Sequence, residues 1–408
     1  MFRAPVLAVL LGCGGSSSPV TPPPVQAPVV SSITLSADGA SLFVGATLQL
    51  TSTARDQQGR AMAATPTWAS DKVGVATASP TGLVTGIAAG SATIQASVGA
   101  VTGSYVVTVA APVTVYVAGQ SYFGRNNYIE YIAGNAPVIL TAPHGGSLNP
   151  ASIPDRIAAA CGGVATTVTD VNTSELVRAM QQRYFARFGK YPHVIIANLS
   201  RRKLDANRLL TEAACGNAEA IAALDEWHGY VDAAKRAVLE TTGKGWYMDI
   251  HGHGHVLQRL ELGYLVADAD LNLPDLSLDA TISFENTASI RTLSQVSPLT
   301  FSALLRGPSS LGTLYANGGF PAIPSVFDPR PNGTDYFDGG DNTRRHSCGA
   351  GASALGGTTN GNICGVQIES NFAGVRDNAA NRDRFGDVTA LVLEEYLRTH
   401  WGLRLASP

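Results

Sequence analysis

Apolar and polar residues alternate over most of the segment from residue 31 to about residue 110. ITLSADGASLFVGATLQLTSTARD shows this alternation between Gly and Asp breaks, and WASDKVGVATASPTGLVTGIAAGSATIQASV continues it with turns about every ten residues. Alternation with a period of two places successive side chains on opposite faces of a strand. Short strands at this spacing predict an all-β sandwich.

The pattern changes at Val115, where apolar runs and helical spacings follow one another. We expect strands in APVILTAPHGG, YPHVIIANLS, GWYMDI and GNICGVQIES, and helices in TSELVRAMQQRYFARFG, AEAIAALDEWHGYVDAAKRAVLETTG and DVTALVLEEYLRTHW. Asn172, Thr173 or Ser174 is available to cap the first helix. Strands that alternate with helices predict an α/β domain with a largely parallel sheet. Residues from about 265 to 345 are expected to be a loop-rich insertion that shapes a substrate pocket.

The first thirteen residues, MFRAPVLAVLLGC, have the outline of an export signal. Arg3 precedes a short apolar run that is too short to span a bilayer as a helix. LLGC resembles the bacterial lipobox, which implies that Cys13 becomes the lipidated first residue; the alternative is a chance cysteine beside a misplaced start codon. GGSSSPVTPPPVQAP then reads as a Gly/Ser/Pro tether. We therefore expect an exported protein, lipid-anchored at the bacterial cell envelope (periplasm or cell surface), whose only membrane contact is through Cys13.

The length of 408 residues predicts two or three domains. We place a signal at 1–13, a tether at 14–30, a sandwich domain at 31–111 and an α/β domain at 115–408. A net charge of -3 provides no electrostatic attraction for a phosphate backbone, so we expect no nucleic-acid partner.

Four cysteines remain after Cys13. In an exported protein they permit two disulfides with three possible connectivities. Sequence order favours Cys161–Cys215 and Cys348–Cys364. The alternative, four free buried thiols, fits an oxidising compartment poorly.

Polar side chains follow the predicted strands of the α/β domain where each strand ends. They are His144 in TAPHGG, Ser200 and Arg201 opening SRRKLDANR, Asp249 and His251 in MDIHGHGH, and Glu369 in VQIESN, with Asp170 just before a helix. Open α/β sheets place their chemistry beyond the carboxyl ends of strands. Three N/O ligands with one open position and a nearby carboxylate are what zinc hydrolysis requires. HExxH, Gly-x-Ser-x-Gly and a P-loop are absent from the sequence. The missing Gly-x-Ser-x-Gly elbow disfavours a metal-free serine hydrolase.

Two parts of the chain resemble known families. VATASPTGLVTGIAAGSATIQA is similar to the group 2 bacterial immunoglobulin-like domain, and the resemblance covers about 80 residues. It implies an immunoglobulin-like sandwich that serves as a spacer or adhesive module and contacts cell-wall or surface glycan.

From about residue 115 to its end, the chain resembles the N-formylglutamate amidohydrolase family, relatives of the zinc carboxypeptidases and amidases. The matching pieces are Pro143-His144-Gly145-Gly146, Asp170, Ser200-Arg201, Asp205-x-Asn207-Arg208, Asp249-Ile250-His251, Tyr336-Phe337-x-Gly339-Gly340 and Gln367-Ile368-Glu369. The chain departs from the family in a longer loop after the first histidine and in Asn371-Phe372, where the family has Asn-Arg. The resemblance implies a zinc-exopeptidase-like fold with a largely parallel mixed sheet.

The resemblance also implies a Zn²⁺ site in which His144 and His251 are ligands. Asp170 is the expected third ligand, with Glu175 as the alternative. We expect Asp249 to orient a histidine or to satisfy the end of its strand.

Glu369 is the expected general base. Asn207 and Arg208 resemble the pair that holds a substrate carboxylate, a role that Arg201 can also fill. The alternative for Arg208 is an internal ion pair with Asp205. His253 is expected to contact substrate or a neighbour of the metal.

His255 is expected at the surface.

Together these expectations describe a zinc-dependent amidohydrolase or carboxypeptidase-like enzyme. It would act on a small acidic or peptide-like substrate, at an amide next to a carboxylate. The alternative is a surface-displayed binding or adhesion protein whose hydrolase domain is degenerate.

Overall fold

The computed structural model describes residues 26–110, 115–349 and 361–405. The predicted signal peptide with Cys13, and the predicted tether up to residue 25, lie outside the described residues. The chain divides into two compact units, one ending at Val115 and the other beginning at Tyr116. Each unit has its own hydrophobic core, so each is described by itself.

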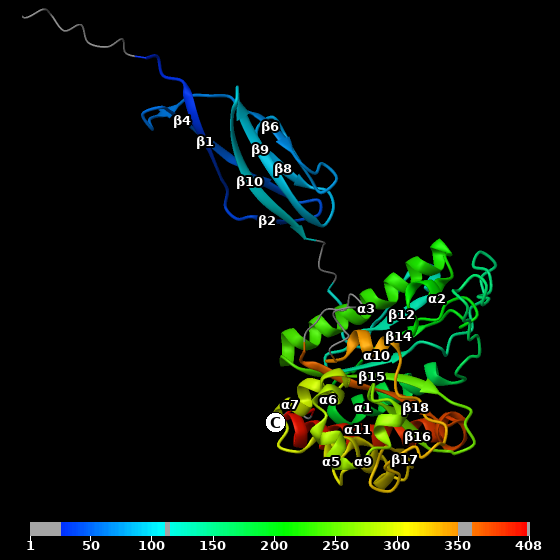
Figure 1. The fold of residues 1–408 in the computed structure, drawn as a ribbon. Helices are drawn as coiled ribbons and strands as arrows, with labels where there is room; N and C mark the ends of the chain where they lie inside the picture. The colour runs from blue at the N-terminus through cyan, green and yellow to red at the C-terminus, as the bar shows by residue number, and fades with distance from the viewer. Residues whose placement is uncertain (1–25, 111–114, 350–360, 406–408) are drawn as a thin grey trace, which may run out of the picture. The chain divides into compact units, whose positions relative to one another are not determined.

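The first unit is all β, as the alternating pattern predicted. Its strands are β1 Val30–Ser36, β2 Ser41–Phe43, β3 Thr47–Gln49, β4 Thr51–Asp56, β5 Ala61–Met62, β6 Thr67–Ser70, β7 Ala76–Ala78, β8 Leu83–Gly86, β9 Gly90–Val98 and β10 Val101–Ala110. They form small sheets in the orders β1-β4-β5, β2-β10-β9-β6 and β3-β8-β7 (Figure 1). Alternate residues of the strands, such as Ile94 and Ala96 of β9, are buried in the core.

The second unit is built on one eight-stranded mixed sheet in the order β11-β12-β14-β13-β15-β18-β16-β17. Its strands are β11 Ser121–Phe123, β12 Ile129–Ile132, β13 Val138–Ala142, β14 His193–Ala197, β15 Gly245–Gly252, β16 Leu260–Gly263, β17 Ala322–Ile323 and β18 Ile363–Ser370. The central strands β14, β13, β15 and β18 are parallel to one another, while β12 and β16 run antiparallel to their neighbours β14 and β18. The predicted α/β class with a largely parallel mixed sheet is therefore confirmed.

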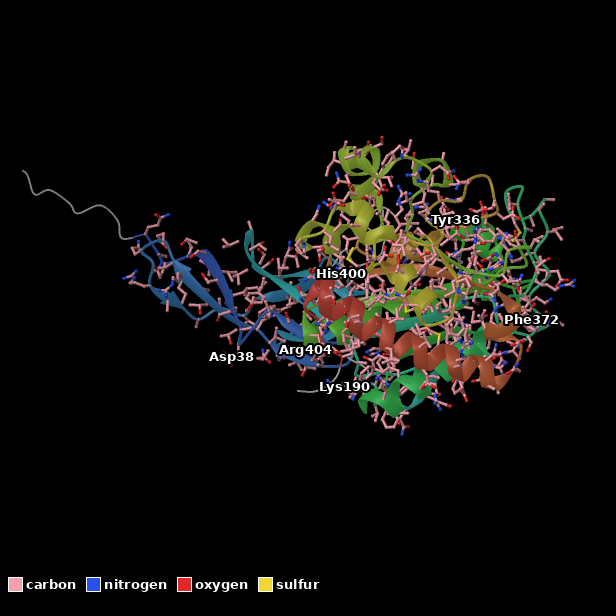
Figure 2. All side chains as sticks on the ribbon, turned by 90° about the horizontal axis from the view of Figure 1, so that it is seen from below. Asp38, Lys190, Tyr336, Phe372, His400 and Arg404 are labelled. Carbon is pink, nitrogen blue, oxygen red and sulfur yellow. A yellow bond between two sulfur atoms is a disulfide. The ribbon has the colours of Figure 1, made fainter. Side chains whose placement is uncertain are left out.

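Helices cover both faces of this sheet (Figure 1). The long helices are α1 Thr173–Phe188, α3 Ala218–Thr242 and α11 Ala379–Trp401. The short helix α2 Leu210–Ala214 lies between β14 and α3 in the chain, and the 3-10 turn η1 Arg125–Asn127 lies between β11 and β12. Trp246, Met248 and Ile250 of β15 pack with α1 and α11, whereas Tyr247 packs with α3 on the opposite face. Figure 2 shows α11 crossing the unit from the side of Phe372 to His400 near its C-terminal end.

The N-terminus of α1 differs from the predicted capping. Asn172 does precede the first helical residue, but its backbone is left-handed (φ 65°) and its side chain makes no capping hydrogen bond. Its Nδ2 instead donates to the carbonyl of Arg376. The side chains of Asn217 and Asn378 do cap α3 and α11, each by accepting from the third residue along.

The segment from about 265 to 345 is more ordered than predicted. It contains α4 Asp268–Leu271, α5 Asp275–Ala280, α6 Ile282–Thr287, α7 Arg291–Val296, α8 Phe301–Arg306, α9 Leu311–Asn317 and α10 Asp341–His346. Each of these helices has between four and seven residues, too few for a repeating helical pattern to stand out in the sequence. Among the described residues, no helix combines the length and the apolar character needed to cross a bilayer.

Candidate metal centre and active site

Three neighbouring strands carry polar side chains of the site in one row. His251 on β15 is paired with Glu369 on β18, and Glu369 is paired with Glu261 on β16. Directly paired residues point to the same face of a sheet, so these three side chains lie side by side. All three are buried. The row stands at the carboxyl ends of β15 and β18, where the sequence predicted the chemistry.

Two histidines and one carboxylate converge beside this row. Nδ1 of His144 and Nδ1 of His251 each lie 3.2 Å from Oδ2 of Asp170. All three residues are buried, and their ligand atoms are close enough to hold one metal ion. Zinc bonds of about 2.0–2.2 Å in a tetrahedral site put neighbouring ligands roughly 3.3 Å apart, so the three atoms fit zinc.

The far side of each histidine ring is held by a second carboxylate. Nε2 of His144 lies 2.6 Å from Oδ1 of Asp205, and Nε2 of His251 lies 2.9 Å from Oδ2 of Asp249. Thr141 Oγ1 in turn donates to Asp249 Oδ1 at 2.5 Å. If a metal ion replaced the protons on Nδ1, each ring would keep its proton on Nε2, toward Asp205 or Asp249, and would offer its Nδ1 lone pair beside Asp170, as a metal ligand requires.

Gly252 allows the chain to pass close to this centre. A Cβ atom at this position would meet Cζ of Arg376 at 2.2 Å. The backbone N–H of Gly252 donates to Asp170 Oδ2 at 3.2 Å. The glycine that follows His251 therefore admits the Arg376 guanidinium and helps to fix the Asp170 carboxylate.

Glu369 is a buried carboxyl group beside the two histidines. Its Oε1 accepts from Nε2 of Gln367 at 2.9 Å and lies 3.8 Å from Nδ1 of His251. Burial raises the pKa of Glu369 to about 7, and the negative charge of Asp170 acts in the same direction.

The pKa of Asp170 is shifted in the opposite direction, although Asp170 is also buried. Burial by itself raises its pKa, but the charges of His144 and His251 and their hydrogen bonds hold the pKa well below the usual range. Asp170 is therefore kept ionised, while the pKa of Glu369 lies near neutral pH; such a difference between two carboxyl groups is typical of acid–base sites.

A cavity of about 330 Å³ opens onto these groups. Its lining also includes Thr166, Val168, Arg201, Arg208, His255 and Phe337. The volume lies at the small end of the range for small-molecule sites.

Of the two arginines predicted to bind a substrate carboxylate, Arg208 has the freer guanidinium. Its Nη1 donates to the carbonyl of Asn207, and its Nε lies 3.6 Å from Glu212. No hydrogen bond from its Nη2 occurs among the described residues. The alternative prediction, an ion pair of Arg208 with Asp205, is wrong.

Arg201 is instead the partner of Asp205. Its Nε donates to Asp205 Oδ2 at 2.9 Å, and its Nη1 lies 3.6 Å from Asp170 Oδ1. The amide oxygen of Asn207 is also committed, because Oδ1 accepts from the backbone N–H of Asn342, and its Nδ2 lies 3.3 Å from His251 Nε2. Arg201 and Asn207 therefore position other groups of the site.

The two histidines after His251, His253 and His255, both line the cavity. His253 has both nitrogens engaged, Nε2 with the carbonyl of Arg259 and Nδ1 with the backbone N–H of His255. His255, which was expected at the surface, is partly buried: its side chain is 21% exposed, and its Nδ1 lies 2.8 Å from Glu261. Glu175, the alternative third ligand, is exposed on the first turn of α1.

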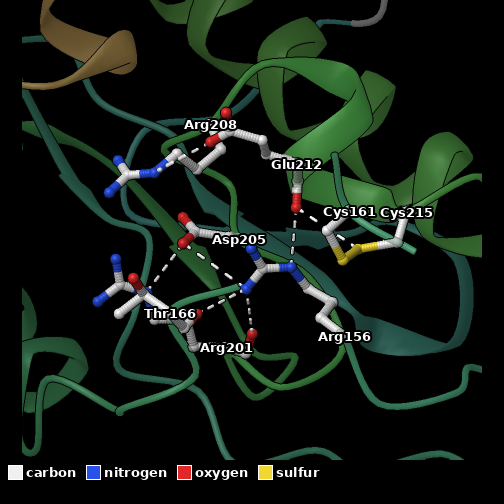
Figure 3. Close-up of a disulfide and its surroundings, with 8 residues drawn as sticks. All are labelled: Arg156, Cys161, Thr166, Arg201, Asp205, Arg208, Glu212 and Cys215. Atoms are coloured by element: carbon white, nitrogen blue, oxygen red, sulfur yellow. Dashed lines mark hydrogen bonds and ion pairs between the residues drawn. A yellow bond between two sulfur atoms is a disulfide. The ribbon is translucent and has the colours of Figure 1, made fainter. Parts of the chain in front are cut away.

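Both predicted disulfides are present. Cys161 is bonded to Cys215, and Cys348 is bonded to Cys364. The first bond fastens the loop between β13 and α1 to the end of α2, close to Arg208 and Glu212 (Figure 3). The loop that contributes Val168 to the cavity is thus covalently anchored.

Arg156, which the sequence did not single out, reinforces this anchor. Its guanidinium donates to the carbonyls of Glu212, Thr166 and Arg201 (Figure 3). It also lies 3.7 Å from Asp205 Oδ2. A second missed residue, Arg376, donates to the carbonyls of Ser370 and His253 and to that of Val171. Each arginine ties together loops that come from distant parts of the sequence.

Comparison with known proteins gives matches of different kinds. No curated protein matches the chain. The solved structure of surface layer protein SbsC, domains 1–6, is 23% identical with a TM-score of 0.19, covering 26% of this chain and 19% of that one. The present chain thus spans only about a fifth of that protein.

Two further solved structures are similar over a longer stretch. One is the N-formylglutamate amidohydrolase from Ralstonia eutropha JMP134, which is 14% identical with a TM-score of 0.36, covering 67% of this chain and 99% of that one. The other is a gene product of Agrobacterium tumefaciens, 14% identical with a TM-score of 0.35, covering 67% and 95%.

The family models match the first unit. Residues 29–109 match the model of the bacterial Ig-like domain (group 2). This range agrees with the β strands from Val30 to Ala110. The first unit of the chain is therefore a group 2 bacterial immunoglobulin-like domain.

Proposed function

We propose that the second unit is a zinc-dependent hydrolase that cleaves an amide bond next to a carboxylate. The supporting observation is the convergence of His144 Nδ1, His251 Nδ1 and Asp170 Oδ2, with Glu369 beside them. Two imidazoles and one carboxylate match the ligand sets of catalytic zinc sites. The substrate class is an N-acyl amino acid, a peptide or a cell-wall fragment.

His144, Asp170 and His251 would hold the ion, and Asp205 and Asp249 would orient the two rings. When bound, zinc supplies Lewis acidity that polarises a carbonyl oxygen and lowers the pKa of water.

Glu369 carries the proton through the reaction. Its carboxylate takes one proton from the attacking water as the new C–O bond forms. The C–N bond then breaks, and the same carboxyl gives its proton to the leaving amine nitrogen. Burial raises the pKa of Glu369 and makes its carboxylate more basic than an exposed one, which suits its part in this exchange.

Arg208 gives the site its preference for a carboxylate. A planar guanidinium can bind a carboxylate through two parallel hydrogen bonds. Arg208 lines the cavity with much of its guanidinium uncommitted, in contrast to Arg201. In an N-acyl amino acid or a peptide, this carboxylate belongs to the amine side of the scissile amide.

The proposal also includes the cellular location of the protein and a role for the first unit. We place the protein outside the cytoplasm, lipid-anchored at the bacterial envelope through Cys13, with the immunoglobulin-like domain in contact with cell-wall or surface glycan. Two disulfides in one chain are consistent with an oxidising compartment.

Elemental analysis together with activity assays tests the proposed function. The purified full chain should contain one zinc ion and hydrolyse amides with a neighbouring carboxylate. Chelation should abolish hydrolysis, and added zinc should restore it. A chain that carries no zinc and keeps its activity in chelator would reject the metalloenzyme.

A further inference from the structure

His255 is held rigidly at the edge of the catalytic cavity. Its Nδ1 lies 2.8 Å from Oε1 of Glu261, and its ring stacks on Phe337 with centroids 4.8 Å apart. Glu261 is itself fully buried, and its other oxygen accepts from the backbone N–H of Phe337 at 2.9 Å. No hydrogen bond to Nε2 of His255 occurs in the described part of the chain. An oriented imidazole thus keeps one nitrogen available to a bound molecule.

A second cavity adjoins the catalytic cavity at this ring. It has a volume of about 210 Å³ and shares His255 with the catalytic cavity. Its remaining lining residues are Val256, Leu257, Gly333, Thr334 and Asp335. Val256 is 92% exposed and Leu257 is 45% exposed, so apolar surface is available beside the active site.

The walls of the second cavity are tied together by a buried arginine. Arg259 donates to Oγ1 of Thr334 at 2.8 Å and to the carbonyl of Asp335 at 3.1 Å. It also pairs with Asp328 at 2.6 Å. Arg259 follows Leu257 by two residues, so the two segments that form the cavity are fixed to each other. The cavity is therefore preformed, as ligand sites usually are.

The same cluster is a poor metal site. Ligand atoms of His253, His255 and Glu261 lie close enough to hold an ion. However, Nε2 of His253 donates to a carbonyl and Nδ1 accepts a backbone N–H. A metal would have to displace one of these bonds, whereas a substrate needs only the free Nε2 of His255.

We propose that the second cavity is a subsite for the acyl side of the substrate. The substrate is then a peptide-like chain that crosses His255, rather than a formylated or acetylated single amino acid. This inference rests on the proposed function, because in the proposed N-acyl amino acid or peptide substrate the carboxylate that Arg208 binds lies on the amine side of the amide. Nδ1–H of His255 is directed to Glu261, so Nε2 accepts a backbone N–H of the substrate. An apolar side chain of the acyl part packs against Val256 and Leu257.

Binding measurements on two ligands of different length test the subsite. The full chain with Glu369→Gln and added zinc is titrated calorimetrically with N-acetylglutamate and with an N-acetyl tripeptide that has two leucines before a C-terminal glutamate. We expect the tripeptide to bind at least about tenfold more tightly, since it alone reaches the apolar surface.

Filling the second cavity should remove this gain. Leu257→Trp, or Val256→Trp if the first variant folds poorly, should return the tripeptide to the affinity of the short ligand and leave the short ligand unchanged. Leu276→Trp on α5 is the matched control, because Leu276 is 84% exposed and lines neither cavity. Its tripeptide affinity should equal that of the parent.

Equal affinity for both ligands, binding of neither, or a gain that survives both blocking variants would overturn the subsite. Failure of the proposed function has a different signature. In that case the tripeptide binds more tightly and the blocking variants remove the gain, but the chain with Glu369 intact hydrolyses neither compound.

Discussion

Nε2 of His144 lies 2.6 Å from Oδ1 of Asp205, a carboxylate with no exposed surface. The other oxygen of Asp205 accepts from Nε of Arg201 at 2.9 Å. Burial raises the pKa of Asp205, but the charge of His144 and its hydrogen bond outweigh burial and hold the pKa well below the usual range. An ionised carboxylate here fixes the His144 ring and increases the basicity of Nδ1.

Asp205→Asn should therefore lower zinc affinity by about 10–100-fold, the usual effect of losing a partner behind a metal ligand. Competition with a chromophoric chelator measures the change. Asp155→Asn is the control, since Asp155 pairs with Arg202 and Lys203 at a partly exposed position. An Asp205→Asn chain with unaltered zinc affinity would show that the contact does not tune the metal centre.

The strands that carry the site were predictable, because buried parallel strands are continuous apolar runs whose ends are marked by polar residues. HVIIA and ICGVQIES are such runs, and they became β14 and β18. His144, His251 and Glu369 were recognised for the same reason. Their position at strand ends is visible in a single sequence.

The partners of these residues were harder to predict, because they depend on which strands become neighbours. Glu261 meets His255 and lies next to Glu369 only because β16 pairs with β18 in one particular register. Asp205 was seen as a partner for Arg208, yet the fold places Arg201, four residues before it, on the same carboxylate. A residue list shows charges but does not determine which of them pair.

The identity of the third ligand gives a second prediction. Asp170→Ala should reduce bound zinc to well below one ion per chain, because its Oδ2 is the oxygen that both Nδ1 atoms approach. Glu175→Ala should keep full zinc content, since Glu175 is exposed. Elemental analysis of both purified variants decides between them. Zinc loss in the Glu175 variant alone would reverse the assignment.

The Cys161–Cys215 bond should affect both stability and substrate binding. Replacing both cysteines by serine should lower the free energy of unfolding by about 2–5 kcal/mol. It should also raise KM, because the released loop carries Thr166 and Val168 into the cavity. Thermal unfolding and steady-state kinetics measure the two effects. The double serine variant of Cys348 and Cys364 is the comparison: neither cysteine lines the cavity, so we expect a loss of stability with KM unchanged.

Arg208→Ala should discriminate between substrates. For a substrate with a carboxylate, KM should rise about 10–100-fold, the scale of a lost hydrogen bond to a charged group. For the matching amide or ester, KM should barely change, because no charge remains to be paired. Equal losses on both substrates would instead indicate that Arg208 supports the chain beside Glu212.

A further prediction concerns the proton carried by Glu369. Glu369→Gln should lower turnover by about 10²–10⁴-fold, because the amide cannot take a proton from water. Zinc content should stay the same, since Glu369 is 3.8 Å from the nearest ligand nitrogen and is not one of the converging ligands. Loss of zinc together with activity would make Glu369 a ligand rather than a base.

The pH dependence of kcat/KM of the wild type should also reflect the proton carried by Glu369. The pKa of Glu369 is raised to about 7 by burial, so the carboxylate form, and with it kcat/KM, decreases as the pH falls below the pKa. A bound cation favours the carboxylate and moves the decrease of kcat/KM at acidic pH below 7.

In the metal-free chain the raised pKa has a consequence for stability. Protonated Glu369 contributes to the free energy of unfolding; this contribution is complete below the unfolded pKa of about 4.5 and is lost as the pH rises through 7. Metal-free Glu369→Gln should therefore gain stability over the wild type above pH 7 but not at pH 4. Denaturant unfolding at both pH values measures this difference, and an equal effect at the two values would contradict a buried, proton-binding Glu369.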